Sequence, residues 1–139
     1  MTDETAVRAV GAASTPAGLT PPTGHVVWLE ACGSSVVDLV HTIQDCLPTH
    51  RLTVAAVWPK DVATHSARAE KAKLMTEDAT GVVQSLQFEL GVEGTTVNVV
   101  VVNSDQVQDL QRTVDYFHGP DGGFVAGCTF DLRPQGVGA

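Results

Sequence analysis

The stretch "GVVQSLQFELGVEGTTVNVVVV", Gly81 to Val102, determines the fold class of this chain. Its first half carries apolar residues at helical spacing, and "GVEG" then ends the helix. Its second half, "TTVNVVVV", is an apolar run that predicts a strand covered on both faces. A long helix that leads through a short turn into a buried strand is typical of a parallel α/β sheet.

The same alternation of strand and helix extends to both sides of this stretch. Strands are predicted at 25–31, 51–58, 95–102 and 124–132, and helices at 35–47, 66–90 and 105–117. Ser35 is the expected N-cap of the first helix, and Pro48 follows its end. We therefore predict an α/β domain of three layers, Rossmann-like or flavodoxin-like, with a mostly parallel sheet of about four or five strands.

Three segments are expected along the chain. Residues 1–23 show no hydrophobic period and are predicted to form a flexible N-terminal segment or a loosely docked lead-in. Residues 24–133 form the α/β domain, and the polar, Gly-rich residues 134–139 form a C-terminal tail. A length of 139 residues is that of one domain with a single core.

Composition excludes several classes of partner. The net charge is -8, with 8 basic and 16 acidic side chains, which disfavours nucleic acid and anionic membrane surfaces. No apolar window is long enough to span a bilayer, and the start of the chain does not resemble a signal peptide, so a cytoplasmic location is expected. The three cysteines are far apart and are expected to be reduced thiols.

Few individual polar residues indicate chemistry. The five histidines (25, 41, 50, 65 and 118) lack metal-ligand spacing, so we expect surface or capping roles and no metal. Cys128 is expected to be a small buried residue in the last strand. Asn98, in the middle of an apolar strand, is expected to hydrogen-bond backbone groups of the sheet.

Residues 72 to 132 resemble the C-terminal half of the short-chain dehydrogenase/reductase (SDR) family. The matching pieces are "SLQFEL" at the end of the long helix, "VN" at Val97–Asn98, and "GGFVAGCTFDL" near the C-terminus. The resemblance implies a fold truncated relative to a full SDR. It also implies that subunits meet through the long helix and the last strand.

The family's catalytic and cofactor-binding residues are missing at the matching positions. The resemblance requires a Tyr and a Lys four residues apart on the long helix, and the register on "SLQFEL" places Ala72 and Thr76 there. The expected phosphate-binding turn reads "EACGSS", with Gly33 as its one glycine and Glu30 beside it. The resemblance therefore implies no catalytic residue and no bound cofactor.

On this basis the chain is identified as a degenerate, truncated SDR-like protein. It is similar to the non-catalytic N-terminal domain of high-molecular-weight 3-oxoacyl-carrier-protein reductases and to other inactive SDR partner subunits. The implied function is that of a pseudoenzyme, an oxidoreductase subunit that pairs in a hetero-oligomer with an intact SDR-type reductase acting on a ketone or hydroxyacyl substrate. Self-association as a homodimer is the other pairing considered.

Two further functions remain open from the residues. One is a stand-alone, flavodoxin-like protein that binds a nucleotide or acyl ligand at the carboxyl ends of its strands. The other is a homodimer with an unrelated enzymatic role that uses His65 or the nearby lysines.

Two groups of apolar residues are candidate interface positions. Leu74, Gly81 and Phe88 recur every seven residues on the long helix, away from its core-facing stripe, and predict a face that packs on another helix. The second group, for which ordinary core positions are an equal alternative, consists of Phe124, Val125 and Phe130.

Overall fold

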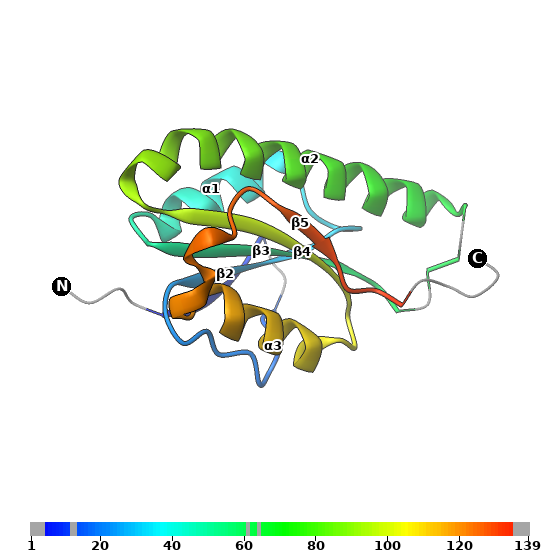
Figure 1. Cartoon of the computed structure of the whole chain (residues 1–139). Coiled ribbons are helices and arrows are strands. Elements are labelled where there is room, and N and C mark those ends of the chain that lie inside the picture. The colour runs from blue at the N-terminus through cyan, green and yellow to red at the C-terminus, as the bar shows by residue number, and fades with distance from the viewer. Residues whose placement is uncertain (1–4, 12–13, 61, 64, 135–139) are drawn as a thin grey trace.

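A computed structural model describes residues 5–11, 14–60, 62–63 and 65–134 of the chain (Figure 1). Its strands form one sheet in the order β1-β2-β3-β4-β5, and every neighbouring pair is parallel. The strands are β1 (Ala6–Ala9), β2 (His25–Glu30), β3 (Arg51–Trp58), β4 (Thr96–Asn103) and β5 (Thr129–Asp131). The predicted α/β fold class is thus confirmed, and the five strands agree with the predicted number.

Three α-helices connect these strands: α1 (Val36–Cys46), α2 (Ala67–Leu90) and α3 (Val107–Phe117). The Ser35 hydroxyl accepts a hydrogen bond from the backbone N–H of Asp38 at 3.2 Å, so the predicted N-cap of α1 is confirmed. Ser66 caps α2 in the same way, by accepting from the N–H of Ala69 at 3.1 Å. Two 3-10 helices complete the fold, η1 (Gly91–Glu93) and η2 (Pro120–Phe124).

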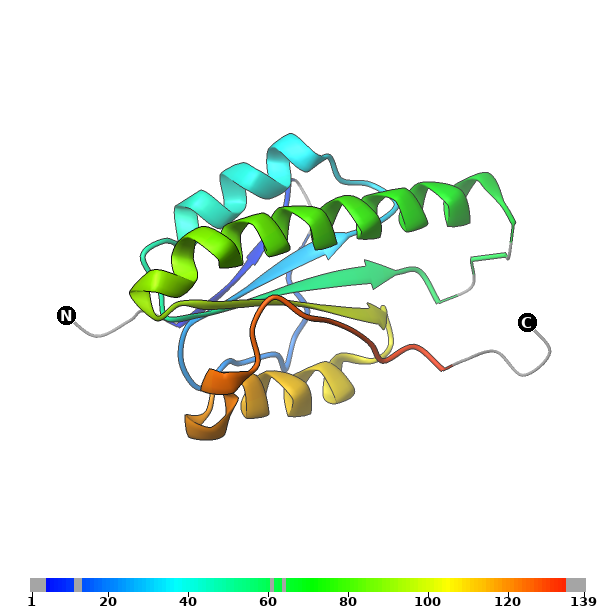
Figure 2. The ribbon, with the colours of Figure 1, turned by 45° about the horizontal axis from the view of Figure 1, so that its top comes forward.

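The helices cover both faces of the sheet (Figures 1 and 2). α1 and α2 lie on one face, where Leu39, Ile43 and Val83 pack on the side chains of β2, β3 and β4. α3 lies on the other face, together with the segment that joins β1 to β2, and Leu19 of this segment joins the second core cluster. The Gln111 side chain of α3 holds the segment by a pair of hydrogen bonds to the backbone of Thr20.

The chain changes face between α2 and α3, and this change shapes the carboxyl edge of the sheet. Each successive strand is added on the same side, but α1 and α2 lie on one face and α3 on the other. The β4–α3–β5 connection therefore has the opposite hand to the two before it, although about 98% of such crossovers share one hand. Because β3 leads to one face and β4 to the other, a crevice opens between their carboxyl ends.

The two ends of the chain differ from the sequence prediction. β1 and the buried Val10 lie inside the N-terminal segment 1–23, for which no strand was predicted, because four residues of an edge strand give too short a pattern to recognise. The predicted last strand 124–132 is shorter, since Gly122 and Phe124 belong to η2 and only residues 129–131 pair with β4. Residues 1–4 and 135–139 lie outside the described residues, so the predicted tail is represented by Pro134 alone.

Candidate functional site

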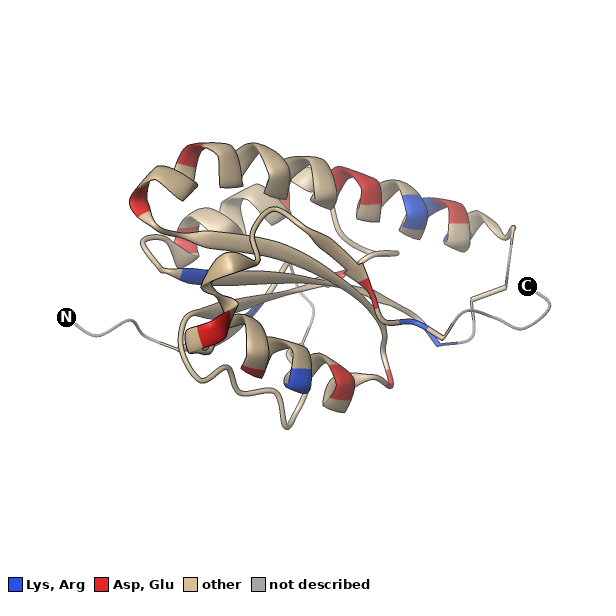
Figure 3. Ribbon diagram, in the orientation of Figure 1, with Lys and Arg blue, Asp and Glu red and all other residues tan. Residues whose placement is uncertain are grey.

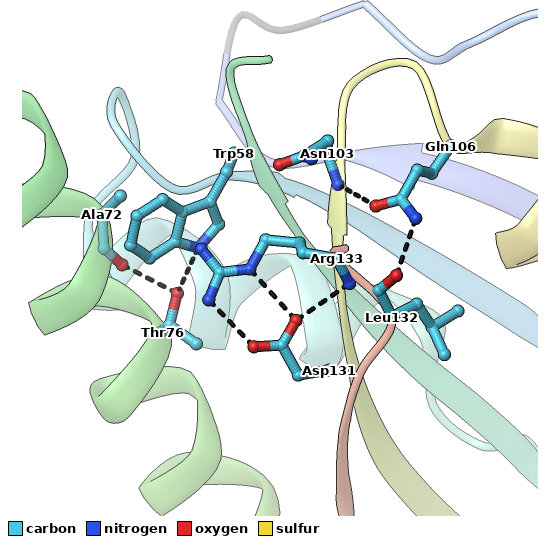
Figure 4. A network of polar contacts seen from close by, with 8 residues as sticks. All are labelled: Trp58, Ala72, Thr76, Asn103, Gln106, Asp131, Leu132 and Arg133. Atoms are coloured by element: carbon cyan, nitrogen blue, oxygen red, sulfur yellow. Dashed lines mark hydrogen bonds and ion pairs between the residues drawn. The ribbon is translucent and has the colours of Figure 1, made fainter. Parts of the chain in front are cut away.

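On the side that faces α2, side chains of the chain itself fill the crevice between β3 and β4 (Figure 4). The indole of Trp58, the last residue of β3, donates through Nε1 to the hydroxyl of Thr76 on α2 at 3.1 Å. The Thr76 hydroxyl in turn donates to the carbonyl oxygen of Ala72 at 2.7 Å. Since Ala72 is fully buried, this part of α2 is in tight contact with the sheet.

The C-terminal strand closes the same crevice from the other side. The guanidinium carbon of Arg133 lies 3.9 Å from the centre of the Trp58 ring, which is cation–π geometry. Asp131 fixes Arg133 with hydrogen bonds to Nη2 at 2.9 Å and to Nε at 3.0 Å. Gln106 accepts from the N–H of Asn103 at 2.8 Å and donates to the carbonyl of Leu132 at 2.7 Å, which ties the end of β4 to this strand.

Arg133 also stabilises the ionised form of the Asp131 carboxyl. Partial burial raises the pKa of the Asp131 carboxyl, but the hydrogen bonds and positive charge of Arg133 outweigh burial, so the pKa is lowered. Asp131 is therefore ionised at neutral pH and suited to holding Arg133 in place, not to donating a proton.

The two positions matched to the family's Tyr and Lys lie in this cluster. Ala72 offers only a buried methyl group, and the Thr76 hydroxyl is used both as donor and as acceptor. Tyr116 lies on α3, across the sheet, with an exposed fraction of 54%. These placements leave no phenol or amine at the two matched positions of the crevice.

A cavity of about 400 Å³ lies beside these side chains, at the carboxyl ends of β2 and β3, and it reaches Ser104, which follows β4. Its lining residues come from four separate segments: Trp28, Glu30, Cys32, Gly33, Val57, Pro59, Arg68 and Ser104. The Cys32 thiol donates to the carbonyl of Arg68 at 3.4 Å and so links the turn before α1 to the first turn of α2. The sequence indicated Glu30 and Gly33 here; Trp28 and Arg68 gave no signal because they lie far apart in the chain.

The first group of candidate interface residues lies together on one face. On the outer side of α2, Leu74 and Phe88 are 59% and 88% exposed, and a Cβ added at Gly81 would meet nothing within 4 Å. Together these three residues are called the α2 outer face. The described residues thus place two large apolar side chains in water on either side of an open glycine.

The second group does not form one surface. Phe124 is 95% exposed on η2, but Val125 is half-buried against the core cluster below the sheet. The centres of the Phe130 and Phe117 rings are 5.1 Å apart, so Phe130 covers the core beside α3. These three residues are close in the sequence, but their side chains have different environments and do not share a surface.

Three polar predictions have different outcomes. Asn98 bonds backbone groups as predicted, but in the loop before β5 and not in the sheet, since it donates to the carbonyl of Val125 at 2.9 Å and accepts from the N–H of Cys128 at 3.0 Å. The prediction for Cys128 is wrong: this residue is exposed, because it precedes β5 at the sheet edge, where no helix covers it. Burial instead applies to Cys46, where it raises the pKa of the thiol to about 11.

The prediction of surface or capping roles is wrong for His25, whereas His118 is buried but occupies the C-cap position of α3. His25 is buried in β2, and His118, the residue after α3, is 4% exposed. His118 contacts the carbonyl of Thr23 through Nδ1 and the hydroxyl of Thr53 through Nε2. A carbonyl can only accept, so Nδ1 carries the proton and Nε2 accepts from Thr53. Burial lowers the pKa of His118, and the charges of Arg51 and His25 lower it further.

Among the described residues, no group of three or more His, Cys, Asp or Glu side chains is arranged to hold a metal ion. In the same part of the chain, no helix has the length and apolar character needed to cross a membrane.

Comparison with known proteins supports the fold and nothing narrower. No model of a known protein family and no curated protein sequence matches the chain. The structure is similar to that of BdcA (YjgI) from E. coli, with a TM-score of 0.52 and 13% sequence identity, over 94% of this chain and 98% of that chain. The similarity supports a Rossmann-like α/β fold.

The identification as a truncated relative of a non-catalytic N-terminal domain is therefore wrong. The similarity to BdcA extends over 98% of that chain, which gives no support to a truncated N-terminal domain of a two-domain reductase. The short matches in "SLQFEL" and "GGFVAGCTFDL" reflect an element order and a helix–turn–strand geometry that Rossmann-like folds share, and such local matches do not specify a family.

Proposed function

We propose that this protein is a non-catalytic subunit that assembles through the α2 outer face with an SDR-type reductase acting on a ketone or hydroxyacyl substrate. Leu74, Gly81 and Phe88 are the residues expected at the contact. The single observation that carries the proposal is the exposure of Phe88, at 88%, in line with Leu74 and an open Gly81 on a 24-residue helix.

The filled crevice supports the non-catalytic part. On the side that faces α2, Trp58, Thr76 and Arg133 occupy the space at the carboxyl ends of β3 and β4, the edge of the sheet where open α/β folds bind their substrates and cofactors. Opening this space would break the Trp58–Thr76 hydrogen bond and the Arg133–Trp58 contact together. A chain without a substrate site of its own would contribute to an enzyme by binding the catalytic subunit through a surface such as the α2 outer face.

The spacing of the α2 outer face supports packing against a second helix. Seven residues make about two helical turns, so Leu74 and Phe88 lie on one line, at equal distances on either side of Gly81. In an antiparallel pair that crosses at Gly81, the Leu74 position of one helix meets the Phe88 position of the other. Gly81 lets the two backbones approach closely at the crossing.

The charges along α2 favour the same arrangement (Figure 3). Lys71 lies before Leu74 and Glu89 directly after Phe88, on the same flank of the stripe by helical geometry. In the antiparallel pair, the basic residue of one helix therefore lies near the acidic residue of a partner helix of like pattern. An SDR-type reductase carries a long helix at the equivalent place in its fold, which is why we propose it as the partner.

The test is reconstitution with purified SDR-type reductases of the same organism. The wild-type chain is expected to form a complex in sedimentation velocity and to raise the thermal midpoint or turnover of the reductase. Phe88→Ser should abolish both effects, because it removes a large apolar side chain from the contact. Tyr116→Ser is the matched control, since it removes a half-exposed aromatic on the opposite face of the sheet.

Each outcome distinguishes the proposal from its rivals. Loss of the complex in Phe88→Ser but not in Tyr116→Ser supports it. If the chain associates only with further copies of itself through the same face, it is a homodimer. Reductase turnover by the chain alone contradicts the non-catalytic role.

The alternative function, a stand-alone small-molecule binding protein, is favoured by one observation. The cavity of about 400 Å³ at the carboxyl ends of β2 and β3 lies within the range of about 300–1,000 Å³ that is typical of ligand sites. Thermal shift with NADPH, FMN and acyl-CoA tests the nucleotide and acyl forms of this alternative.

A further inference from the structure

We infer that the cavity at the carboxyl ends of β2 and β3 binds a small zwitterion, an α-amino acid with an apolar side chain. The inference specifies the ligand class for the small-molecule alternative, on which it rests, and it is independent of assembly through α2. It is carried by the combination of an apolar floor with two side chains of opposite charge in the lining of one cavity.

The floor of the cavity is apolar and belongs to the core. Trp28 and Val57, from adjacent strands, are 5% and 3% exposed, and Pro59 follows β3 at the rim. Side chains so firmly packed do not move to fill the cavity. A ligand group that covers them is apolar and compact, because the volume of about 400 Å³ leaves little room for a dinucleotide.

Two charged side chains of opposite sign line the same cavity. Glu30 ends β2 and Arg68 lies in the first turn of α2. Among the described residues, the ion pairs are Lys60–Asp105, Arg112–Asp109 and Arg133–Asp131, so Glu30 and Arg68 pair neither with each other nor with a third group. Both charges remain available to a ligand that enters between them.

Arg68 lies where other features also favour an anion. The cavity meets the N-terminal ends of α1 and α2, since it is lined by Gly33, just before α1, and by Arg68, in the first turn of α2. The N-terminal end of a helix carries partial positive charge, which adds to that of the guanidinium. A ligand carboxylate is thus expected at Arg68.

The Glu30 carboxylate then decides the class of ligand. A phosphate or an acyl carboxylate that binds Arg68 would place a second negative charge near Glu30, at a cost from like-charge repulsion. A neutral ligand would leave both side chains without a partner. An ammonium group next to a carboxylate satisfies both, and an α-amino acid carries these two groups on one carbon atom.

The experiment uses the full-length protein and three probes of one shape. L-leucine carries both charges, 4-methylpentanoate lacks the ammonium group, and 3-methylbutylamine lacks the carboxylate. Isothermal titration is expected to show that L-leucine binds more tightly than either analogue by roughly tenfold or more, the effect of losing a hydrogen bond to a charged group. Because the chain also contains Trp58, fluorescence is measured in Trp58→Phe, in which Trp28 alone reports the same binding within the cavity.

Two variants assign each charge. Glu30→Gln should lower the affinity for L-leucine to that for 4-methylpentanoate and leave the affinity for 4-methylpentanoate itself unchanged or higher. Arg68→Gln should lower the affinity for L-leucine to that for 3-methylbutylamine and leave the affinity for 3-methylbutylamine itself unchanged or higher. The matched controls, Glu93→Gln and Lys73→Gln, change the net charge equally but lie outside the cavity lining, and they should leave all three affinities unchanged.

The inference is overturned if neither L-leucine nor L-phenylalanine binds at millimolar concentration, or if L-leucine binds no better than its two analogues. It is also overturned if Glu30→Gln and its control have equal effects. A monomer that binds L-leucine would leave this inference intact while removing the assembly role, so the two failures can be distinguished.

Discussion

Trp58 and Thr76 hold β3 against α2: the indole Nε1 donates to the threonine hydroxyl at 3.1 Å, and Arg133 covers the other side of the ring at 3.9 Å. This contact lies at the carboxyl end of the sheet, where open α/β folds bind their ligands. It forms a structural joint between a central strand, the long helix and the C-terminal segment.

Removal of this hydrogen bond is expected to destabilise the fold. A double-mutant cycle of Trp58→Phe and Thr76→Val should give a coupling energy of about 0.5–1.5 kcal/mol, the net value of one hydrogen bond. Urea denaturation of the four proteins measures it. Thr42→Val is the matched control, because the Thr42 hydroxyl bonds only the carbonyl of Asp38 in its own helix. A coupling energy of zero would contradict the role of Trp58 as a joint.

Asn98 is expected to be the main anchor of the C-terminal strand. Its amide bonds both Val125 and Cys128, so Asn98→Ala leaves one part-buried carbonyl and one part-buried N–H without their partner. The expected loss is about 1–3 kcal/mol for each group left unsatisfied. Gln84→Ala, on the exposed side of α2, should cost little. Equal losses in the two variants, by urea denaturation, would contradict the anchoring role.

The stability of the protein is expected to fall in mild acid because of His118. Its folded pKa lies below the ordinary 6.5, since burial outweighs the Thr23 hydrogen bond and Asp115, which raise the pKa. Between 6.5 and the lower folded pKa, the unfolded chain binds more protons. The free energy of unfolding therefore decreases as the pH falls through this window, and it becomes constant below the folded pKa.

His118→Gln should remove most of that pH dependence. Urea denaturation of the wild type and the variant at about pH 7.5 and about pH 5 measures the difference, at roughly 1.4 kcal/mol for each unit of pKa shift. His25 and Arg51, which also face His118, are retained in both proteins, so their own contributions cancel to first order. An unchanged slope in His118→Gln would assign the pH dependence to another group.

Two glycines are expected to respond in opposite directions to alanine. Gly24 has a φ of +73°, and an added Cβ would lie 2.2 Å from the carbonyl oxygen of Arg51, so Gly24→Ala should destabilise the fold by more than about 1 kcal/mol. Gly81 lies in α2 with open space around it, so Gly81→Ala should stabilise the isolated chain by about 0.5–1 kcal/mol. Thermal unfolding of the two variants compares them. A gain for Gly24→Ala would contradict the close approach at Arg51.

The long, strongly patterned elements were predictable from sequence. β3 has the predicted bounds, and α2 begins at Ala67 after the Ser66 cap and ends at Leu90 as predicted. The hydrophobic period and the capping residues of such an element lie within one continuous segment, so the local sequence pattern is sufficient to predict the element. The short edge strands β1 and β5 were missed or overextended, because pairing with a neighbouring strand, and not their own pattern, defines them.

The candidate site was less predictable, because its members come together only in three dimensions. Trp58, Thr76 and Arg133 belong to a strand, a helix and the C-terminal segment. Sequence reasoning identified Ala72 and Thr76 by a family register but gave no sign that Trp58 fills the space beside them. Cys128 was misassigned for the same reason, since the apolar run around it does not reveal that β5 lies at the sheet edge.

The account depends most on the α2 outer face as the contact to an SDR-type reductase. Sedimentation velocity of the purified chain, mixed with each SDR-type reductase of its organism, tests this contact most directly. The account predicts a complex with the wild-type chain that is lost in Phe88→Ser and retained in Tyr116→Ser. A wild-type chain that sediments as a monomer in every mixture, or a complex that Phe88→Ser leaves intact, would contradict it.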